Sequence, residues 1–143
     1  MTEKDYSGTP LYKKLGIKAG SSIGLTNEPD DFLDTLGALP EGVEILDRAS
    51  RLLDVIVLFS RTRAHLGRRF PAMKKLLASD GGLWVAYPKK DSDYFQELTF
   101  GDVQELGLSE GLVDNKSCAI DDDWSAVRFV YRKSDRPRVS ATR

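Results

Sequence analysis

Five polar residues at the ends of predicted strands carry the clearest ligand chemistry in this sequence. They are Asn27, Ser60, Arg61, Lys89 and Lys90. In open α/β sheets, ligands bind beyond the carboxyl ends of the strands, near the point where the strand order switches. Three cations and two small polar groups gathered there could hold a carboxylate or a phosphate, so the sequence predicts a site for a small anionic ligand. The alternative is that the two lysines simply solvate a loop.

The loop after the first predicted strand argues against a nucleotide cofactor. Binding of NAD or ATP requires glycines there, so that backbone amides can approach phosphate at a helix N-terminus. Residues 26–31 contain no glycine and three carboxylates, which would repel a phosphate. We therefore predict no cofactor of this kind. S-adenosylmethionine is less clearly excluded, because it carries no phosphate.

One cysteine, Cys118, and one histidine, His65, limit the catalytic chemistry that the chain can perform. They cannot assemble a zinc site of the usual Cys/His kind, so no metal is predicted. We expect His65 to face solvent among arginines, outside any nucleophile–histidine–acid triad, and Cys118 to be a small buried group. The aspartates at 121–123 lack the calcium-loop pattern and predict a hairpin turn, with Trp124 packed into the core or against the N-terminal arm. No residue is assigned a catalytic role.

The charge balance argues against nucleic acid and membranes as partners. The 143 residues include 21 basic and 22 acidic side chains, so no overall field favours either surface. A basic helix face at 61–75 could contact phosphates, but no aromatic residues interleave with its charges, which favours a solvated face. The N-terminal residues lack the apolar core of a signal peptide, and no segment approaches the length of a membrane span. We expect a cytoplasmic protein; the oligomeric state stays open.

The elements that must position these residues are clearest between residues 53 and 90. The run 55–59 is apolar and β-branched, which predicts a strand covered on both faces. Apolar residues from Leu66 to Leu77 then recur at helical spacing, and Asp80-Gly81-Gly82 is predicted to end that helix. Residues 83–87 predict a second buried strand. A strand, a crossover helix and a parallel strand of one sheet are almost always right-handed.

Weaker patterns complete a single domain at residues 11–133, with an N-terminal arm at 1–10 and a flexible tail at 134–143. In the last predicted strand, the apolar residues 127, 129 and 131 alternate with Arg128 and Arg132, which indicates an antiparallel hairpin at or near an edge. Further strands are predicted at 22–26, 43–46, 112–120 and 124–132, and short helices at 11–15, 32–39 and 99–108.

This order of elements resembles a shortened Rossmann-like methyltransferase fold, which ends in such a hairpin. The segments 14–20 and 79–83 look like its lead-in and one of its turns. The resemblance implies a three-layer, mostly parallel sheet of about six strands in the order 2-1-3-4-6-5. It also implies that Asp47 could hydrogen-bond the ribose of S-adenosylmethionine, although the glycine-rich loop of those enzymes is missing. A turn residue is the alternative reading of Asp47.

A second resemblance covers nearly the whole chain. Its motifs are Tyr6-Ser7-Gly8-Thr9-Pro10-Leu11 with Lys14-Leu15-Gly16, Gly82-Leu83-Trp84-Val85 with Pro88-Lys89-Lys90, and Cys118-Ala119-Ile120-Asp121 with Trp124-Ser125. They are similar to a family of small bacterial proteins that is known as a domain of unknown function. The resemblance implies a fold and a bacterial cytosolic setting, but it assigns neither an activity nor catalytic residues. The sequence thus favours a non-catalytic domain that binds a small anionic ligand or a protein partner, with a shortened methyltransferase-like enzyme as the alternative.

Overall fold

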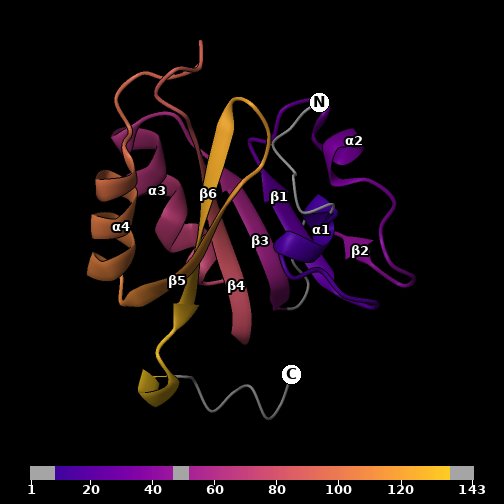
Figure 1. The fold of residues 1–143 in the computed structure, drawn as a ribbon. Helices are drawn as coiled ribbons and strands as arrows, with labels where there is room; N and C mark the ends of the chain where they lie inside the picture. Colours follow the sequence, from indigo (N-terminus) through magenta and orange to yellow (C-terminus); the bar gives the residue numbers. More distant parts are fainter. Residues whose placement is uncertain (1–8, 47–51, 136–143) are drawn as a thin grey trace.

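The chain folds as an α/β domain around one six-stranded sheet (Figure 1). A computed structural model describes residues 9–46 and 52–135. The strands are β1 (Ser22–Thr26), β2 (Glu44–Ile45), β3 (Leu53–Phe59), β4 (Leu77–Pro88), β5 (Leu112–Ala119) and β6 (Trp124–Tyr131). The helices are α1 (Leu11–Lys14), α2 (Phe32–Leu36), α3 (Arg63–Lys74) and α4 (Phe100–Ser109), followed by a short 3-10 turn η1 (Lys133–Asp135).

The strand order is β2-β1-β3-β4-β6-β5, which confirms the predicted order and fold class. β1 pairs in parallel with both β2 and β3, and β3 pairs in parallel with β4. β6 lies between β4 and β5 and is antiparallel to both, so the predicted C-terminal hairpin is present. The carboxyl ends of β1, β3 and β4 therefore meet at one edge of the sheet.

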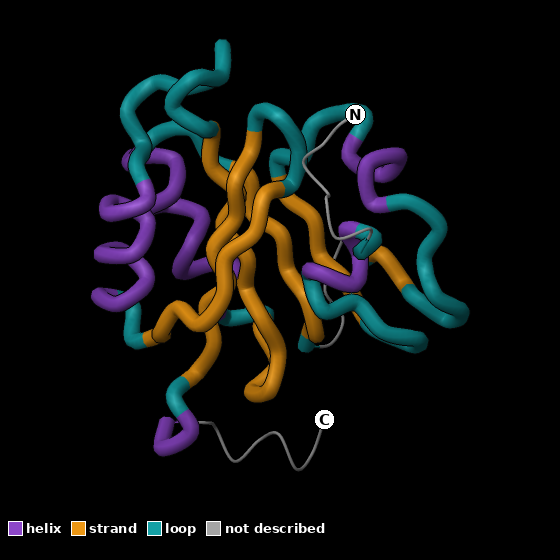
Figure 2. The backbone as a smooth tube through the Cα atoms, viewed as in Figure 1, coloured by secondary structure: helices purple, strands orange, loops and turns teal. Residues whose placement is uncertain are grey.

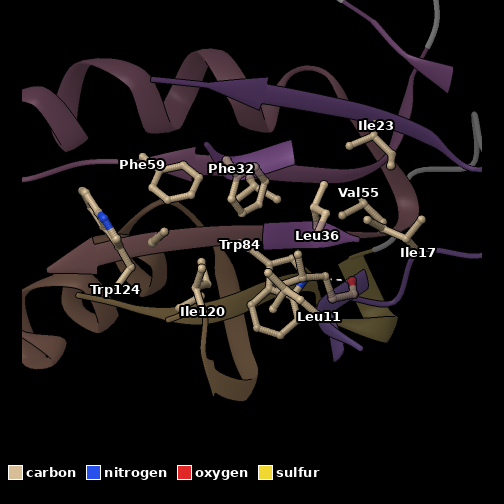
Figure 3. Packing of buried hydrophobic residues seen from close by; sticks show 14 residues of the cluster. Leu11, Ile17, Ile23, Phe32, Leu36, Val55, Phe59, Trp84, Ile120 and Trp124 are labelled. Atoms are coloured by element: carbon tan, nitrogen blue, oxygen red, sulfur yellow. Dashed lines mark hydrogen bonds between the residues drawn. The ribbon is translucent and has the colours of Figure 1, made fainter. Parts of the chain in front are cut away.

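Helices cover the sheet on both faces. α1 and α2 pack on one face, where aromatic and aliphatic side chains form a core that includes Phe32, Phe59 and Trp84 (Figure 3). α3 and α4 pack on the opposite face around Phe70 and Phe129. Burial on both sides explains why β3 is almost entirely apolar, since neither of its faces meets water.

The crossover from β3 to β4 differs from the prediction in one respect. α3 ends at Lys74 and β4 already begins at Leu77, so Asp80-Gly81-Gly82 lies inside a strand and does not end the helix. Here β4 bulges: Leu53 pairs with Leu77, but Val55 pairs with Gly82. A Cβ atom on Gly81 would lie 2.7 Å from the Asp54 carbonyl oxygen, so this glycine permits a close backbone approach.

The other predicted elements agree with the structure to different extents. The strand at 22–26 is confirmed as predicted, whereas β2 and α2 are shorter than the patterns at 43–46 and 32–39 indicated. Most of the predicted arm and tail, and Asp47, lie outside the described residues. None of the helices in the described part of the chain is long and apolar enough to cross a membrane.

Candidate ligand-binding site

A cavity of about 330 Å³ opens at the carboxyl edge of the sheet, and we call it the carboxyl-edge cavity. The loops that follow β1, β3 and β4, together with the start of β6, supply its walls. Its lining residues are Asn27, Glu28, Pro29, Asp30, Arg61, Tyr94 and Trp124. The site thus lies where ligands of open α/β sheets bind.

An aromatic wall leads from the core to this cavity. Phe59 packs edge-on against Trp124, with ring centroids 5.0 Å apart, and Figure 3 shows the two rings at one end of the core. Tyr94 stacks on Trp124 at a centroid distance of 5.8 Å and an interplanar angle of 28°. Trp124 is buried, while Tyr94 remains 41% exposed. We call Phe59, Trp124 and Tyr94 the aromatic wall; Tyr94 is its exposed member and is held against the buried Trp124.

Arg61 also contacts the ring of Tyr94. Its guanidinium carbon lies 4.6 Å from the centroid of Tyr94, within the range of a cation–π interaction. Arg61 is itself exposed, and it directly follows Ser60 at the end of β3. The planar guanidinium and the aromatic wall together form a surface on which a flat ring could stack.

Asn27 fixes the loop after β1. Its backbone has a φ of 61°, a left-handed conformation that asparagine tolerates better than most residues. Its side-chain amide Nδ2 donates a hydrogen bond to the Phe59 carbonyl oxygen at 3.1 Å, which ties the end of β1 to the end of β3. Asn27 thus adopts a backbone conformation that is usually found at glycine. Unlike a glycine, it carries a side chain, which occupies space that a phosphate would otherwise use.

The loop that carries Tyr94 is held by the hairpin turn. The backbone N–H of Lys89 donates to the Asp123 carbonyl oxygen at 2.8 Å, and the Ser92 hydroxyl donates to Asp123 Oδ1 at 2.9 Å. The N–H of Tyr94 in turn donates to Ser92 Oγ. In Figure 2 this loop and the turn between β5 and β6 lie at the same end of the sheet. The aspartate turn thus positions the aromatic wall.

The structure brings together two of the five predicted site residues. Asn27 and Arg61 line the same cavity, while Ser60 is fully buried behind it. Lys89 and Lys90 lie on the loop after β4 and are not among the described residues that line the cavity. That Lys89 and Lys90 contribute to an anion site therefore stays a prediction.

Ser60 contacts the single histidine. Ser60 Oγ lies 2.8 Å from His65 Nδ1 and 3.2 Å from the Thr62 carbonyl oxygen. The expectation that His65 faces solvent is wrong, because this contact holds it half-buried at the start of α3. Burial, and then the positive charges of Arg68 and Arg69, lower the pKa of His65. The neutral imidazole braces the turn that carries Arg61; within the described residues no carboxylate hydrogen-bonds to its ring, so no triad forms.

The charges around the cavity are mixed. Glu28 and Asp30 supply two carboxylates, and Arg61 supplies one guanidinium. A ligand with both an acidic and a basic group would complement this lining better than a purely anionic one. The described residues contain no cluster of three or more metal-ligating side chains.

Cys118 plays no part in this site. It packs against the core beneath α1, as expected for a strand cysteine, and is half-buried. Burial raises the pKa of its thiol to about 11, and the nearby charges of Lys14 and Lys116 only partly oppose that rise. Because the thiolate is the reactive form, this cysteine is a poor nucleophile at neutral pH.

The sequence did not identify two aromatic residues, Trp124 and Tyr94, as part of the ligand site. Trp124 was recognised only as a packing residue beside the aspartate turn. Tyr94 lies in a polar loop with no periodic pattern, so nothing in the sequence pointed to it. Glu28 and Asp30 were noted only as charges that exclude phosphate, a property that also suits a cationic ligand.

The fold is similar to solved structures of methyltransferases, although no family model and no curated protein match the sequence. The ribosomal protein L11 methylase of Lactobacillus delbrueckii subsp. bulgaricus superimposes with a TM-score of 0.57 at 10% identity, over 84% of this chain and 74% of that protein. A magnesium protoporphyrin IX methyltransferase from Synechocystis PCC 6803, solved with bound SAM, gives 0.55 at 8% identity, over 85% and 74%. A SAM-dependent methyltransferase from Aquifex aeolicus gives 0.54 at 11% identity, over 83% and 86%. At such identities the likeness shows a Rossmann-like methyltransferase fold, and the resemblance to the small bacterial family stays a prediction.

Proposed function

We propose that the carboxyl-edge cavity binds a nucleoside of the S-adenosylmethionine type. The observation that carries the proposal is the combination of a stacking surface, formed by Tyr94 and the Arg61 guanidinium, with two carboxylates in one cavity. An adenine ring could pack against the exposed edge of Tyr94 and the plane of the guanidinium. Arg61 could pair with the carboxylate of the methionyl group, while Glu28 and Asp30 could pair with its ammonium or with the sulfonium.

Two further points support this ligand over NAD or ATP. S-adenosylmethionine carries no phosphate, so the acidic loop after β1 does not repel it. Its net charge is positive, which the two carboxylates of the cavity complement. The methyltransferases of similar fold include proteins solved with SAM or SAH bound. The proposal concerns binding alone, because no side chain of the cavity has been assigned a catalytic role.

Isothermal titration calorimetry with S-adenosylmethionine and S-adenosylhomocysteine tests the proposal. The full chain should bind both with dissociation constants below about 1 mM. Tyr94→Ala should weaken both by about tenfold, since stacking on one aromatic ring contributes about 1–1.5 kcal/mol. Phe100→Ala is the matched control: it removes a similarly exposed aromatic ring outside the cavity and should leave both affinities unchanged. An absence of binding heat for either nucleoside at 1 mM would overturn the proposal.

The two ligands also separate the charge contributions. S-adenosylhomocysteine lacks the sulfonium charge, so a carboxylate that pairs with the sulfonium contributes to only one of the two affinities. Glu28→Gln or Asp30→Asn should therefore weaken S-adenosylmethionine more than its demethylated product. Equal effects on both ligands would mean that the carboxylates contact the ammonium group and not the sulfonium.

A further inference from the structure

A second cavity, of about 410 Å³, lies at the opposite edge of the sheet, near the amino ends of β1 and β3. We call it the amino-edge cavity. The segment between α1 and β1 forms one wall, and the β5–β6 hairpin forms another. Its charged lining consists of Lys14, Lys18, Lys116, Arg128, Asp54 and Asp80. Four cations against two carboxylates leave a formal excess of two positive charges.

Arg128 is built into the floor of this cavity. It extends across Gly82 of β4, where a Cβ atom would lie 2.2 Å from the arginine Nε. The missing side chain therefore makes room for the guanidinium. Arg128 is half-buried, and burial lowers the pKa of its guanidinium, which remains charged. Its hydrogen bond to Asn115 Oδ1 is long, at 3.5 Å, so the buried charge is weakly compensated by that contact.

A β-bulge brings a second cation opposite the first. Along β5, Asp114 pairs with Phe129 but Lys116 pairs with Arg128, so Asn115 is the extra residue. The bulge places Lys116 on the same face as Arg128, whereas strict alternation would have placed it on the other. Like charges directly opposite each other on neighbouring strands are destabilising. An anion between them would turn this repulsion into two favourable contacts.

Lys14 approaches the same place from α1. Both Lys14 and Lys116 act electrostatically on the Cys118 thiol, which shows that the two lysines converge on one region of the sheet. Asp54 accepts a hydrogen bond from the Ser22 N–H at 3.0 Å, so part of its charge is already used within the fold. With Asp80 as the second carboxylate of the lining, the four cations still leave the cavity net positive.

We propose that the amino-edge cavity binds a small dianion, a phosphate ester or a dicarboxylate, anchored by Arg128, Lys116 and Lys14. The cavity is large enough for a small metabolite and too confined for a folded partner. This inference does not depend on the nucleoside proposed for the opposite edge. The two sites share no lining residue.

An NMR titration of the full ¹⁵N-labelled chain with inorganic phosphate, and separately with succinate, tests this inference. Ionic strength is held constant with sodium chloride, so that general screening does not change. The indole of Trp84 reports on the cavity, because its Nε1 donates to the carbonyl oxygen of the lining residue Leu15 at 2.9 Å. We expect saturable shifts of this signal, with dissociation constants of about 1–10 mM for at least one anion. Binding of phosphate alone, or of succinate alone, identifies which dianion the site prefers.

Variants of one exposed lysine make the test specific. Lys116→Gln should weaken the dianion about fivefold or more, and Lys116→Arg should retain it. Lys75→Gln removes the same charge from an exposed position outside the cavity and should have no effect. Lys116 is exposed on the edge strand, so its variants should fold. The inference is overturned if neither anion gives a saturable shift, or if Lys116→Gln binds as tightly as the wild type.

Discussion

At the carboxyl ends of β1 and β3 the sheet is bordered by stacked aromatic rings and carboxylates, whereas its amino ends are bordered by lysine and arginine side chains. The two cavities are similar in size, at about 330 and 410 Å³. They differ in how their key side chains are held. Tyr94 is positioned by packing against Trp124, while Arg128 is positioned by the absence of a side chain at Gly82.

This difference shows how one small domain can present two chemistries without a second domain. The carboxyl edge is assembled from loops, which are free to vary and tolerate mixed charges. The amino edge also draws on residues of the strands themselves, where a bulge and a glycine position two of its four cations, Lys116 and Arg128. We expect that a substitution can abolish ligand binding at one edge without changing it at the other.

The largest effect should come from Trp124, which joins the core to the aromatic wall. Trp124→Ala should lower the free energy of unfolding by about 3–5 kcal/mol, because it removes a buried aromatic side chain and leaves a cavity. Trp124→Phe keeps a ring against Phe59 and should cost less. Urea denaturation measures both. A loss below about 1 kcal/mol for the alanine variant would mean that the wall is not part of the core.

A smaller effect, confined to the amino edge, is expected from Gly82→Ala. The new Cβ would displace the flexible end of Arg128, so phosphate binding should weaken about fivefold while the free energy of unfolding changes by less than about 1 kcal/mol. Gly67→Ala is the matched control: nothing lies near its Cβ position in α3, and it should stabilise the helix by about 0.5–1 kcal/mol. Unchanged phosphate affinity in Gly82→Ala would contradict the proposed role of Arg128.

The smallest effect is a pH dependence of the free energy of unfolding, which arises from His65 beside the turn that carries Arg61. The folded protein lowers the pKa of His65, so the unfolded chain binds more protons as the pH falls below about 6.5. The stability that neutral His65 contributes is therefore present above that pH and is lost as the pH falls through the lower, folded-state pKa. Denaturation curves between pH 7.5 and 5.5 should show this loss, and His65→Gln should flatten it. A slope that persists in the variant would assign the titration to another group.

Much of the fold was predictable because buried strands have a simple signature. The apolar runs of β3 and β4 predicted two buried strands, and the alternating pattern of β6 predicted the hairpin. The strand order followed from the resemblance to the methyltransferase fold, and the structure confirms it. The end of α3 was predicted wrongly because Asp80-Gly81-Gly82 looks like a helix stop. In the structure these residues form a bulge whose glycine is required by the neighbouring strand, and that requirement is visible only in three dimensions.

The candidate sites were less predictable, because they depend on contacts distant in sequence. Asn27 and Arg61 could be placed at the carboxyl edge from strand ends alone. Tyr94 reaches the cavity only because Asp123, 29 residues further along the chain, holds its loop. The contact of His65 with Ser60 was missed because a basic helix face suggests exposure, while the buried end of β3 lies one turn away.

The two tryptophan indole signals provide the most direct test of the central claim, that the carboxyl edge binds a nucleoside of the S-adenosylmethionine type. Trp124 borders the carboxyl-edge cavity, and Trp84 contacts a residue that lines the amino-edge cavity. In an NMR titration with S-adenosylhomocysteine, we expect a saturable chemical-shift change of the Trp124 indole signal and none of the Trp84 indole signal. If neither signal shifts, or if only Trp84 shifts, the nucleoside does not bind at the carboxyl edge.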